Sequence, residues 1–580
     1  MGAHVKRTSY TVAGLAAVLA FTGMGVAPGQ AAVTAPVDCP KPFPTEQAVD
    51  GVAGTGFTVE KGTTPDPFTA EVIGRITDGI EPGTDMIMAR VSSPAITRAG
   101  GVWAGMSGSP VYASDGRLIG AVAYGLAGNT DIAGITPAET MFELLTPSTS
   151  ARSGSRAGAS RVAVTAAAAK QLAAAGVSTQ AARAGFRRIV LPLSVSGAAG
   201  AGERKISAKF LGKLPDVRLM TGGGRAAATA AAPSQIKAGG NFVAALSYGD
   251  FTAAATGTTT FVCGGRAVAF GHPFLWAGSS SYSAHSGTAV FVQPDKVRVP
   301  FKVANPGGVV GTVDRDLTAG ISAKLGAGPR TTLITSSLAK VGGRPVVATT
   351  RATDEGFTPS AAAYHVLYSA TKVLGSASKG SASMSVKISG VKANGKAFTV
   401  AWSDRYADTY DLPFTLGLAV FDPLSSLVGQ EYENARITAV DIKGTMESTV
   451  REYRVEGVTV KQGTRYVTPR TVVVRPGAKL DLKVALASYK NLLGSRTVNM
   501  SVTAPRTASR SGVLEVRAGR TYATGRITSF DTLVKALNGT GGSNLIRVTL
   551  RFDNGKEASA VSTQSAVVRG HLAGWPVRTS

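Results

Sequence analysis

The chain has 580 residues, a formal net charge of +25 and only two cysteines. This length exceeds what a single hydrophobic core supports, so two to four domains are expected. The composition argues against two classes of protein. Dispersed basic residues with few aromatics do not favour a nucleic-acid binder. Two cysteines with scattered histidines provide no zinc cluster, so we predict no metal and no cofactor.

The N-terminus has the composition of a secretory signal peptide. Lys6 and Arg7 form a basic start, an apolar stretch covers 12–26, and small residues gather around 31–35. This order predicts a cleaved leader over 1–32. An uncleaved anchor is the alternative, but the apolar stretch is shorter than the ~20 residues that span a bilayer. We therefore predict a secreted, extracellular protein with no transmembrane segment after cleavage.

Removal of the leader leaves a net charge of +23. Such a surface attracts polyanions, which outside a cell are wall polymers or anionic lipid heads. Anionic cell-wall polymers are therefore candidate partners, and the cell wall is a candidate location. The charge is dispersed along the chain, so we interpret it mainly as background.

Residues 36–145 have the pattern of short β-strands separated by turns. Strands are predicted over 71–76, 86–91, 109–112 and 118–124. Asp115-Gly116, between the last two, is a strong hairpin signal. A closing helix is predicted over Ala138–Leu145. The next segment, 146–185, is interpreted as a Ser-, Gly- and Arg-rich linker followed by an Ala-rich helix.

A second strand-rich block is predicted over 186–375, after which the chain changes character. Within this block a weakly ordered crossing is expected at 222–232, and strands are expected at 242–246, 251–262 and 267–270. From 376 to 580 short strands follow one another with turns between them. We expect one or two β-sandwich-like modules there, with a short helix at 531–537.

The hexapeptide Gly105-Met-Ser-Gly-Ser-Pro110 is the first candidate for chemistry. A nucleophilic serine needs its hydroxyl on a tight turn and backbone N–H groups aimed at the developing oxyanion. Flanking glycines permit such a turn. In the chymotrypsin-like arrangement, this pattern makes Ser107 the nucleophile and places the amides of Gly105 and Ser107 in the oxyanion hole. A Gly/Ser-rich turn without chemistry is the alternative.

His272 is the candidate general base. It lies in Val268-Ala-Phe-Gly-His-Pro-Phe274, after a predicted strand, where a glycine before it and a proline after it fix the backbone. A structural histidine in a turn is the alternative. Of the other histidines, His285 is expected in a Ser-rich surface loop, His365 on an amphipathic helix and His571 in the C-terminal tail.

These segments resemble the SpoIVB-type serine peptidase family. The serine-bearing part of that family is similar to Gly100-Gly-Val-Trp-Ala-Gly-Met-Ser-Gly-Ser-Pro-Val-Tyr112, Gly116-Arg-Leu-Ile-Gly-Ala-Val-Ala-Tyr124 and Ile132-Ala-Gly-Ile-Thr-Pro137. Its histidine-bearing part is similar to Gly249-Asp250, Thr256-Gly-Thr258, Ala269-Phe-Gly-His-Pro273 and Gly311-Thr-Val-Asp-Arg-Asp316. The resemblance covers roughly 40–330. It implies a mainly β fold in which a chymotrypsin-like double β-barrel is assembled from two sequence blocks.

The order of the two blocks departs from the family. The family places its histidine block first, whereas here Ser107 precedes His272 by 165 residues, so the blocks must dock to make one site. Cys39 and Cys263 form an isolated pair, which in an exported protein predicts a disulfide. Such a bond ties the blocks together close to His272. Two unpaired buried thiols are the alternative.

The catalytic acid is left open. The family places an aspartate before a proline upstream of the nucleophile, where this chain has Ser93-Pro94. Asp314 and Asp316 follow the histidine block at a distance that suits an acid of the same barrel, and Asp85 and Asp131 flank the serine block. If none of them reaches the histidine, the site works as a dyad or is inactive.

The sequence therefore predicts an exported serine endopeptidase that cleaves protein or peptide substrates through an acyl-enzyme, its own chain included. The alternative is a catalytically inactive secreted scaffold or cell-surface binding protein with a peptidase-like fold. The missing upstream aspartate favours this alternative. The joint presence of Gly105, Ser107, Gly108 and His272 favours the enzyme.

Overall fold

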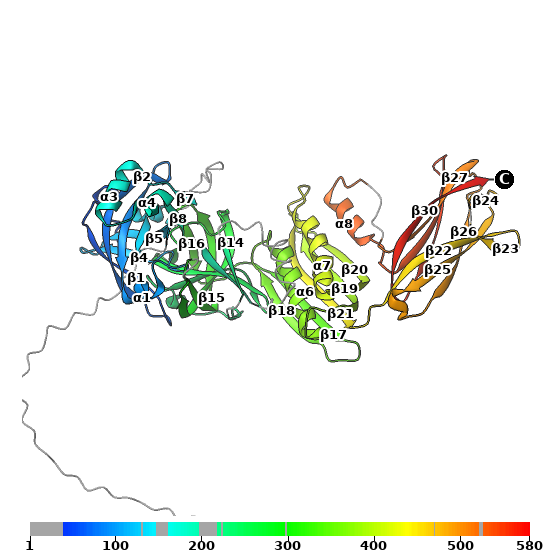
Figure 1. The fold of residues 1–580 in the computed structure, drawn as a ribbon, viewed down its shortest axis with the longest axis horizontal. Coiled ribbons are helices and arrows are strands. Elements are labelled where there is room, and N and C mark those ends of the chain that lie inside the picture. Colours follow the sequence, from blue (N-terminus) through cyan, green and yellow to red (C-terminus); the bar gives the residue numbers. More distant parts are fainter. Residues whose placement is uncertain are drawn as a thin grey trace, which may run out of the picture. The chain divides into compact units, whose positions relative to one another are not determined.

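The structure is a computed structural model, in which the described residues are 39–128, 131–146, 160–196, 217–221, 224–295, 299–468, 470–520 and 526–579. The predicted leader, most of the predicted linker (147–159) and Gly222-Gly223 of the predicted crossing lie outside these residues. Among the described residues, no helix has the length and apolar character that a membrane span requires. The fold is mainly β, as predicted, and its strands form three sheets (Figure 1).

The first sheet contains a closed antiparallel barrel of six strands. Around the barrel the order is β1-β2-β3-β6-β5-β4, and β4 pairs with β1 to close it. The strands are β1 (Ala53–Thr58), β2 (Asp66–Glu81), β3 (Thr84–Ser92), β4 (Pro110–Ala113), β5 (Leu118–Leu126) and β6 (Ile132–Pro137). Gly120 lets β5 and β6 approach closely, because a Cβ there would lie 2.1 Å from the Thr136 carbonyl oxygen.

Short elements extend this barrel. β8 (Phe186–Arg188) pairs with β5, and β7 (Arg161–Val162) pairs with β8. The helices are α1 (Pro94–Ala99), α2 (Ala138–Phe142), α3 (Ala166–Ala174) and α4 (Thr179–Ala184). Ser93 caps the N-terminus of α1, because its hydroxyl accepts a hydrogen bond from the Ile96 amide, and Pro94 is the first residue of the helix.

The second sheet contains another closed six-stranded antiparallel barrel. Its order is β11-β12-β13-β16-β15-β14, and β14 pairs with β11. The strands are β11 (Asn241–Gly249), β12 (Thr252–Cys263), β13 (Arg266–Ala269), β14 (Gly278–Gln293), β15 (Phe301–Leu317) and β16 (Gly320–Leu325), with β9 (Leu191–Ser196) and β10 (Val217–Thr221) beyond β12. Both barrels thus follow the order first, second, third, sixth, fifth, fourth. The predicted double β-barrel is confirmed.

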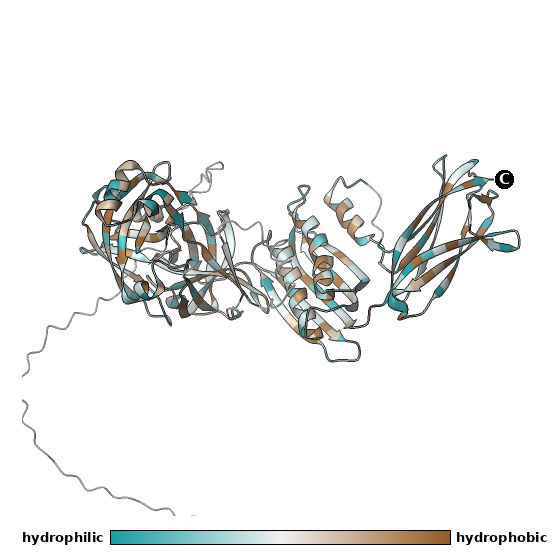
Figure 2. Cartoon of the chain, viewed as in Figure 1, coloured by the Kyte–Doolittle hydropathy of each residue, from teal (hydrophilic) through white to brown (hydrophobic). Residues whose placement is uncertain are grey.

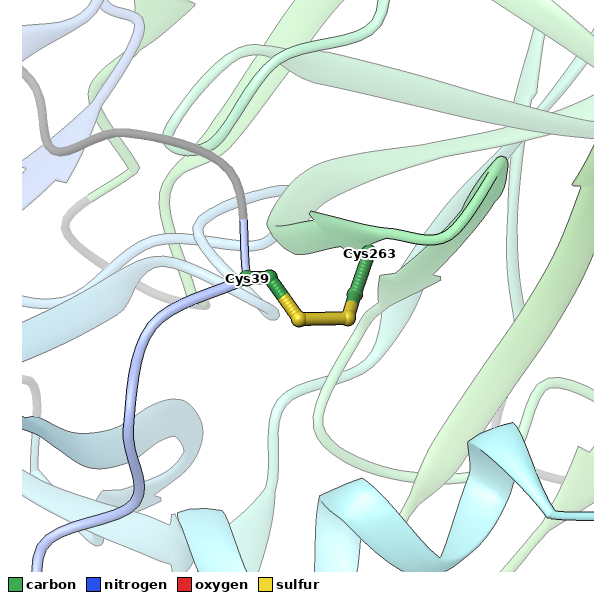
Figure 3. The surroundings of a disulfide bond; sticks show 2 residues. All are labelled: Cys39 and Cys263. Carbon is green, nitrogen blue, oxygen red and sulfur yellow. A yellow bond between two sulfur atoms is a disulfide. The ribbon is translucent and has the colours of Figure 1, made fainter.

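The two barrels are joined covalently and by backbone hydrogen bonds. Cys39, which precedes β1, forms a disulfide with Cys263 at the end of β12 (Figure 3). The Cys39 amide also donates to the Val262 carbonyl at 2.7 Å. Gly62, between β1 and β2, exchanges two hydrogen bonds with Ala289 of β14, at 2.7 and 2.9 Å. These contacts hold the two sequence blocks against each other.

An α/β layer continues the second sheet. Beyond β11 the order is β18-β17-β21-β19-β20, and the helices α6 and α7 pack on each other and on this sheet. The elements are β17 (Thr332–Lys340), β18 (Val346–Ala352), α6 (Thr358–Leu374), β19 (Gly380–Val391), β20 (Ala397–Asp408), α7 (Leu412–Val428) and β21 (Arg436–Glu447). The domain boundary expected at 376 falls inside this layer, since β19, β20 and β21 belong to it.

The third sheet is a β-sandwich-like module whose two halves share β30. Its strands are β22 (Glu452–Gln462), β23 (Arg465–Val467), β24 (Val472–Val474), β25 (Lys479–Ser488), β26 (Arg496–Thr503), β27 (Ser511–Ala518), β28 (Leu545–Phe552), β29 (Glu557–Thr563) and β30 (Val567–Thr579). Polar and apolar residues alternate along them (Figure 2), and the apolar ones form a common core. The predicted short helix is α8 (Phe530–Asn538).

Candidate active site

Ser107 lies on a tight turn between α1 and β4. Gly105 and Gly108 adopt φ values of 96° and 92°, a region that favours glycine. The Gly108 amide donates to the Val122 carbonyl at 2.8 Å, which fastens the turn to β5. The other wall is β12, because a Cβ on Gly108 would lie 2.0 Å from the Thr258 carbonyl oxygen. The turn is therefore held between the two barrels.

His272 lies on the turn that follows β13 in the second barrel. Phe270 and Gly271 both have positive φ, at 74° and 68°. This turn also packs on the first barrel, since the Thr136 hydroxyl donates to the Gly271 carbonyl at 2.6 Å. The docking of the barrels thus presents the histidine to the serine turn.

Ser107 and His272 form a direct hydrogen bond. The Ser107 Oγ lies 3.0 Å from the His272 Nε2, and the His272 Nδ1 lies 2.8 Å from the Pro273 carbonyl oxygen. A carbonyl oxygen only accepts, so the proton of the neutral ring is on Nδ1. Nε2 therefore carries the lone pair, and the Ser107 hydroxyl donates to it. This is the arrangement that a general base requires.

Burial keeps the imidazole neutral. His272 is 1% exposed, and its burial is the main cause that lowers its pKa to about 3, with the positive charge of Arg188 as a second cause. Hydrogen bonds to the carbonyls of Pro273 and Ile189 act in the opposite direction. The neutral, proton-accepting ring consequently persists across the physiological pH range.

Three hydrogen bonds from β12 fasten the serine turn. The Thr258 amide donates to the Ser107 carbonyl at 2.8 Å, and its hydroxyl donates to the Gly105 carbonyl at 3.2 Å. The Thr260 hydroxyl donates to the Gly108 carbonyl at 2.9 Å. These bonds satisfy carbonyl groups that point into the barrel interface. The roles of both threonines escaped the sequence analysis, because nothing local marks which strand will face the turn.

The backbone amides of Gly105 and Ser107, predicted from the sequence as oxyanion donors, have no hydrogen-bond acceptor among the described residues. Buried N–H groups without partners are rare in folded proteins. Both amides belong to the turn that carries the Ser107 hydroxyl, and free backbone N–H groups are the kind of donor from which an oxyanion accepts hydrogen bonds.

Lys302 is a third residue of the site that no sequence pattern marks. It is 2% exposed, and its Nζ donates to the Asn241 Oδ1 at 3.0 Å. Burial lowers its pKa to about 7, although the negative charge of Asp66 acts in the opposite direction. A Cβ placed on Gly105 would lie 2.9 Å from the Cβ of Lys302, so the lysine packs directly over the serine turn.

Of the four acids considered from the sequence, Asp316 hydrogen-bonds to the segment that directly follows the histidine turn. Its carboxylate accepts hydrogen bonds from the amides of Phe274, Leu275 and Ala277, at 2.8, 2.7 and 3.3 Å. Burial raises its pKa above the ordinary value, although these amide donors oppose the shift. Asp316 thus holds the segment that directly follows Pro273, and in the described residues it makes no hydrogen bond to the His272 ring.

The other three acids are engaged elsewhere. Asp314 pairs with Arg266 on the second barrel, Asp85 pairs with Arg75 at 3.0 Å, and Asp131 pairs with Arg90 at 2.8 Å. No ion pair or hydrogen bond links any of them to His272 among the residues that the structure describes. The partner of the His272 Nδ1 is therefore a backbone carbonyl.

Asp316→Asn is expected to lower the free energy of unfolding by about 1–3 kcal/mol, because an amide NH2 group would replace one of two oxygens that face backbone donors. Asp314→Asn is the matched control. Asp314 lies two residues away in a partly exposed ion pair, which contributes at most about 1 kcal/mol. Urea unfolding of the two variants measures the difference, and equal losses would contradict this role of Asp316.

The structure contains a second buried Ser–His pair in the α/β layer. The His365 Nε2 lies 2.9 Å from the Ser336 Oγ, and its Nδ1 lies 2.9 Å from the Thr350 Oγ1. Ser336 sits within β17 rather than on a glycine turn. Its backbone amide belongs to a strand and is not placed to bind an oxyanion. This pair resembles a structural network, and it offers an internal comparison for the pair at Ser107.

Burial also lowers the pKa of His285 and of His365, each to about 4. With His272 this makes three neutral buried rings. None of the three is expected to titrate in the folded protein between pH 7.5 and 5. Because the unfolded chain protonates its histidines near pH 6.5, these groups oppose folding increasingly as pH falls from about 6.5 towards 4, by up to about 1.4 kcal/mol per pH unit each. Side-chain NMR of the imidazoles measures the titrations, and a midpoint near 6.5 for any of these rings would contradict the prediction.

Comparisons of the chain with protein-family models, with curated proteins and with solved structures found no match. Among the described residues, no group of three or more His, Cys, Asp and Glu side chains gathers where it could hold a metal ion. What the site does is therefore inferred from its own geometry.

Proposed function

We propose that the protein is an exported serine peptidase of the SpoIVB type. The observation that carries the proposal is the 3.0 Å contact between the Ser107 Oγ and the proton-accepting Nε2 of His272. Two further features support it, namely the unoccupied amides of Gly105 and Ser107 and the barrels with the same strand order. The N-terminal sequence and the disulfide support export.

In the proposed reaction, the Ser107 Oγ attacks the carbonyl carbon of a peptide bond and passes its proton to the His272 Nε2. The developing oxyanion accepts hydrogen bonds from the amides of Gly105 and Ser107. The imidazolium then donates its proton to the leaving amine as the C–N bond breaks. Water attacks the acyl-enzyme, again with His272 as base, and releases the product acid.

The acid of the usual triad is replaced in this proposal by a backbone carbonyl. The Pro273 oxygen fixes the tautomer of His272, and Asp316 holds the chain that follows Pro273 through its amides. A neutral carbonyl stabilises the imidazolium less than a carboxylate does, so proton transfer is expected to be slower than in a complete triad. Asp316 is accordingly a positioning residue.

The site is closed in this structure. Ser107 is 0% exposed and His272 is 1% exposed, so a peptide gains access only after a local opening. The serine turn is covered from the second barrel by Thr258 and Lys302. We therefore propose that this conformation is latent and that a movement between the barrels exposes the serine.

The proposal is tested by cleavage of an unfolded protein substrate at a series of urea concentrations below the unfolding midpoint. The expected result is a rate that rises with urea, because low denaturant favours the open state, and that then collapses as the protein unfolds. Hydrolysis should be absent from the Ser107→Ala variant throughout. No cleavage at any concentration would instead favour a protein without peptidase activity.

The full burial of the pair favours one second candidate. A buried Ser–His hydrogen bond can also be purely structural, as the bond between Ser336 and His365 is in the α/β layer. At Ser107 such a bond would only tie the two barrels together. In that case the protein is an inactive secreted scaffold or surface-binding protein that has kept a peptidase-like fold.

A further inference from the structure

The sandwich module carries more than half of the net positive charge of the chain. Residues 451–580 contain 21 Lys and Arg against 7 Asp and Glu, a net charge of +14 out of +25. They make up less than a quarter of the length. The charge is therefore concentrated in the part of the molecule that contains neither Ser107 nor His272, and it is not an even background.

Six exposed cations lie together where β22 ends. We call this set the basic end, and it consists of Lys461, Arg465, Arg475, Arg506, Arg510 and Arg578. The register brings them to the same end of the module, near β23 and the C-terminus (Figure 1). Thr579, for example, pairs with Val474 beside Arg475, and its amide donates to the Arg510 carbonyl at 3.0 Å.

The basic end has fewer counter-charges than cations. Asp481 lies near Lys461 and pairs with Lys479, and the Asp553 carboxylate accepts a hydrogen bond from the Ser511 hydroxyl beside Arg510. At the other end of the module, cations pair directly with carboxylates. There, Arg569 pairs with Glu452 and Arg520 with Asp404, each at 2.7 Å. None of the six cations of the basic end forms an ion pair within the described residues. Exposed like charges without partners repel one another and create a positive potential that attracts anions.

The shape of the basic end indicates what kind of anion it fits. Its cations come from several strand ends and turns, and neighbouring strands are about 4.8 Å apart, so the charges form a spread array that suits a repeating polyanion. The turns 462–464, 476–478 and 507–509 contain no large apolar side chain, and the exposed apolar residues near them, Val467, Val473 and Val513, are single valines on strands rather than a continuous apolar tip. Among the described residues beside it, the exposed ring of Tyr466 has the Lys483 Nζ 4.2 Å from its centre, so a cation already occupies one face of the ring that a base would stack on.

We propose that the basic end binds a polymer of phosphodiester-linked units. Five of its six cations are arginines, whose planar forks match phosphate oxygens in pairs. The inference is independent of the peptidase proposal, because no residue of the basic end belongs to the site at Ser107. It assigns the module the task of holding the protein on a phosphate-rich surface polymer.

The test measures binding of the full mature chain to immobilised poly(glycerol phosphate) at low and at physiological salt. The tip variant replaces Arg475, Arg506, Arg510 and Arg578 by glutamine. It is expected to bind at least about tenfold more weakly and with a flatter salt dependence, because fewer counterions are released on binding.

The matched control removes the same charge elsewhere in residues 451–580, with Arg454, Lys490, Arg496 and Arg526 replaced by glutamine. It should bind within about threefold of the unchanged protein. Equal losses in both variants, or no loss in the tip variant, would overturn the proposal. So would tighter binding to phosphatidylglycerol vesicles or to a single-stranded oligonucleotide than to the polymer. Thermal unfolding checks that both variants keep the fold.

Discussion

Ser107→Ala is expected to reduce peptide hydrolysis by at least about a thousandfold, because removal of the nucleophile leaves only binding and oxyanion stabilisation. His272→Gln should cause a loss of the same order, since the base and the nucleophile act as a unit. The double variant should then be no worse than either single variant. The rates are compared at the urea concentration at which the unchanged protein is most active, and losses that multiply would contradict a shared site.

The second Ser–His pair provides the control for this prediction. Ser336 is buried and hydrogen-bonded to a histidine as Ser107 is, but it lies within a strand of the α/β layer. Ser336→Ala should lower stability by about 1–3 kcal/mol and leave hydrolysis unchanged. If it abolishes hydrolysis as Ser107→Ala does, the loss reflects unfolding and not chemistry.

Removal of the disulfide is expected to lower the stability of the barrels by about 2–5 kcal/mol, because Cys39 and Cys263 are 224 residues apart and their bond restricts a long loop of the unfolded chain. The Cys39→Ala/Cys263→Ala variant should unfold its barrels at lower urea, reported by the fluorescence of Trp103, which is fully buried in the first barrel. It should also show faster hydrolysis below its midpoint, since the bond holds the two blocks together.

The sandwich module is the internal reference for the disulfide prediction. It contains neither cysteine, so its own transition should stay at the same urea concentration in the variant. The unchanged protein under reducing conditions should behave like the variant. Barrel transitions that coincide with and without the bond would contradict the proposed role of the disulfide.

The features that the sequence predicts best are those with local causes. The turns at Ser107 and His272 are marked by glycines and a proline, which restrict the backbone wherever they occur. The alternating strands likewise have a period that is visible without tertiary structure. The mainly β, double-barrel fold followed from these signals together with the family resemblance.

The features that the sequence did not predict depend on tertiary contacts. His285, expected in a surface loop, is 0% exposed within β14, because its Ser-rich neighbours form a strand whose inner face fills a barrel. The helix α7 was missed because Pro413, Gly417 and Pro423 suggest turns, although Pro413 lies in its first turn, where proline is tolerated. The role of Asp316 depends on backbone amides that no sequence pattern marks.

The measurement that tests the peptidase proposal most directly is mass-spectrometric mapping of the adduct formed by a small fluorophosphonate. This reagent reacts with a serine whose hydroxyl is activated by a base. The reaction is carried out at urea concentrations below the unfolding midpoint, so that the site can open. The expected result is one adduct, on Ser107, that forms faster as urea rises and is absent from the His272→Gln variant. No adduct on Ser107, or an adduct that forms equally well without His272, would contradict it.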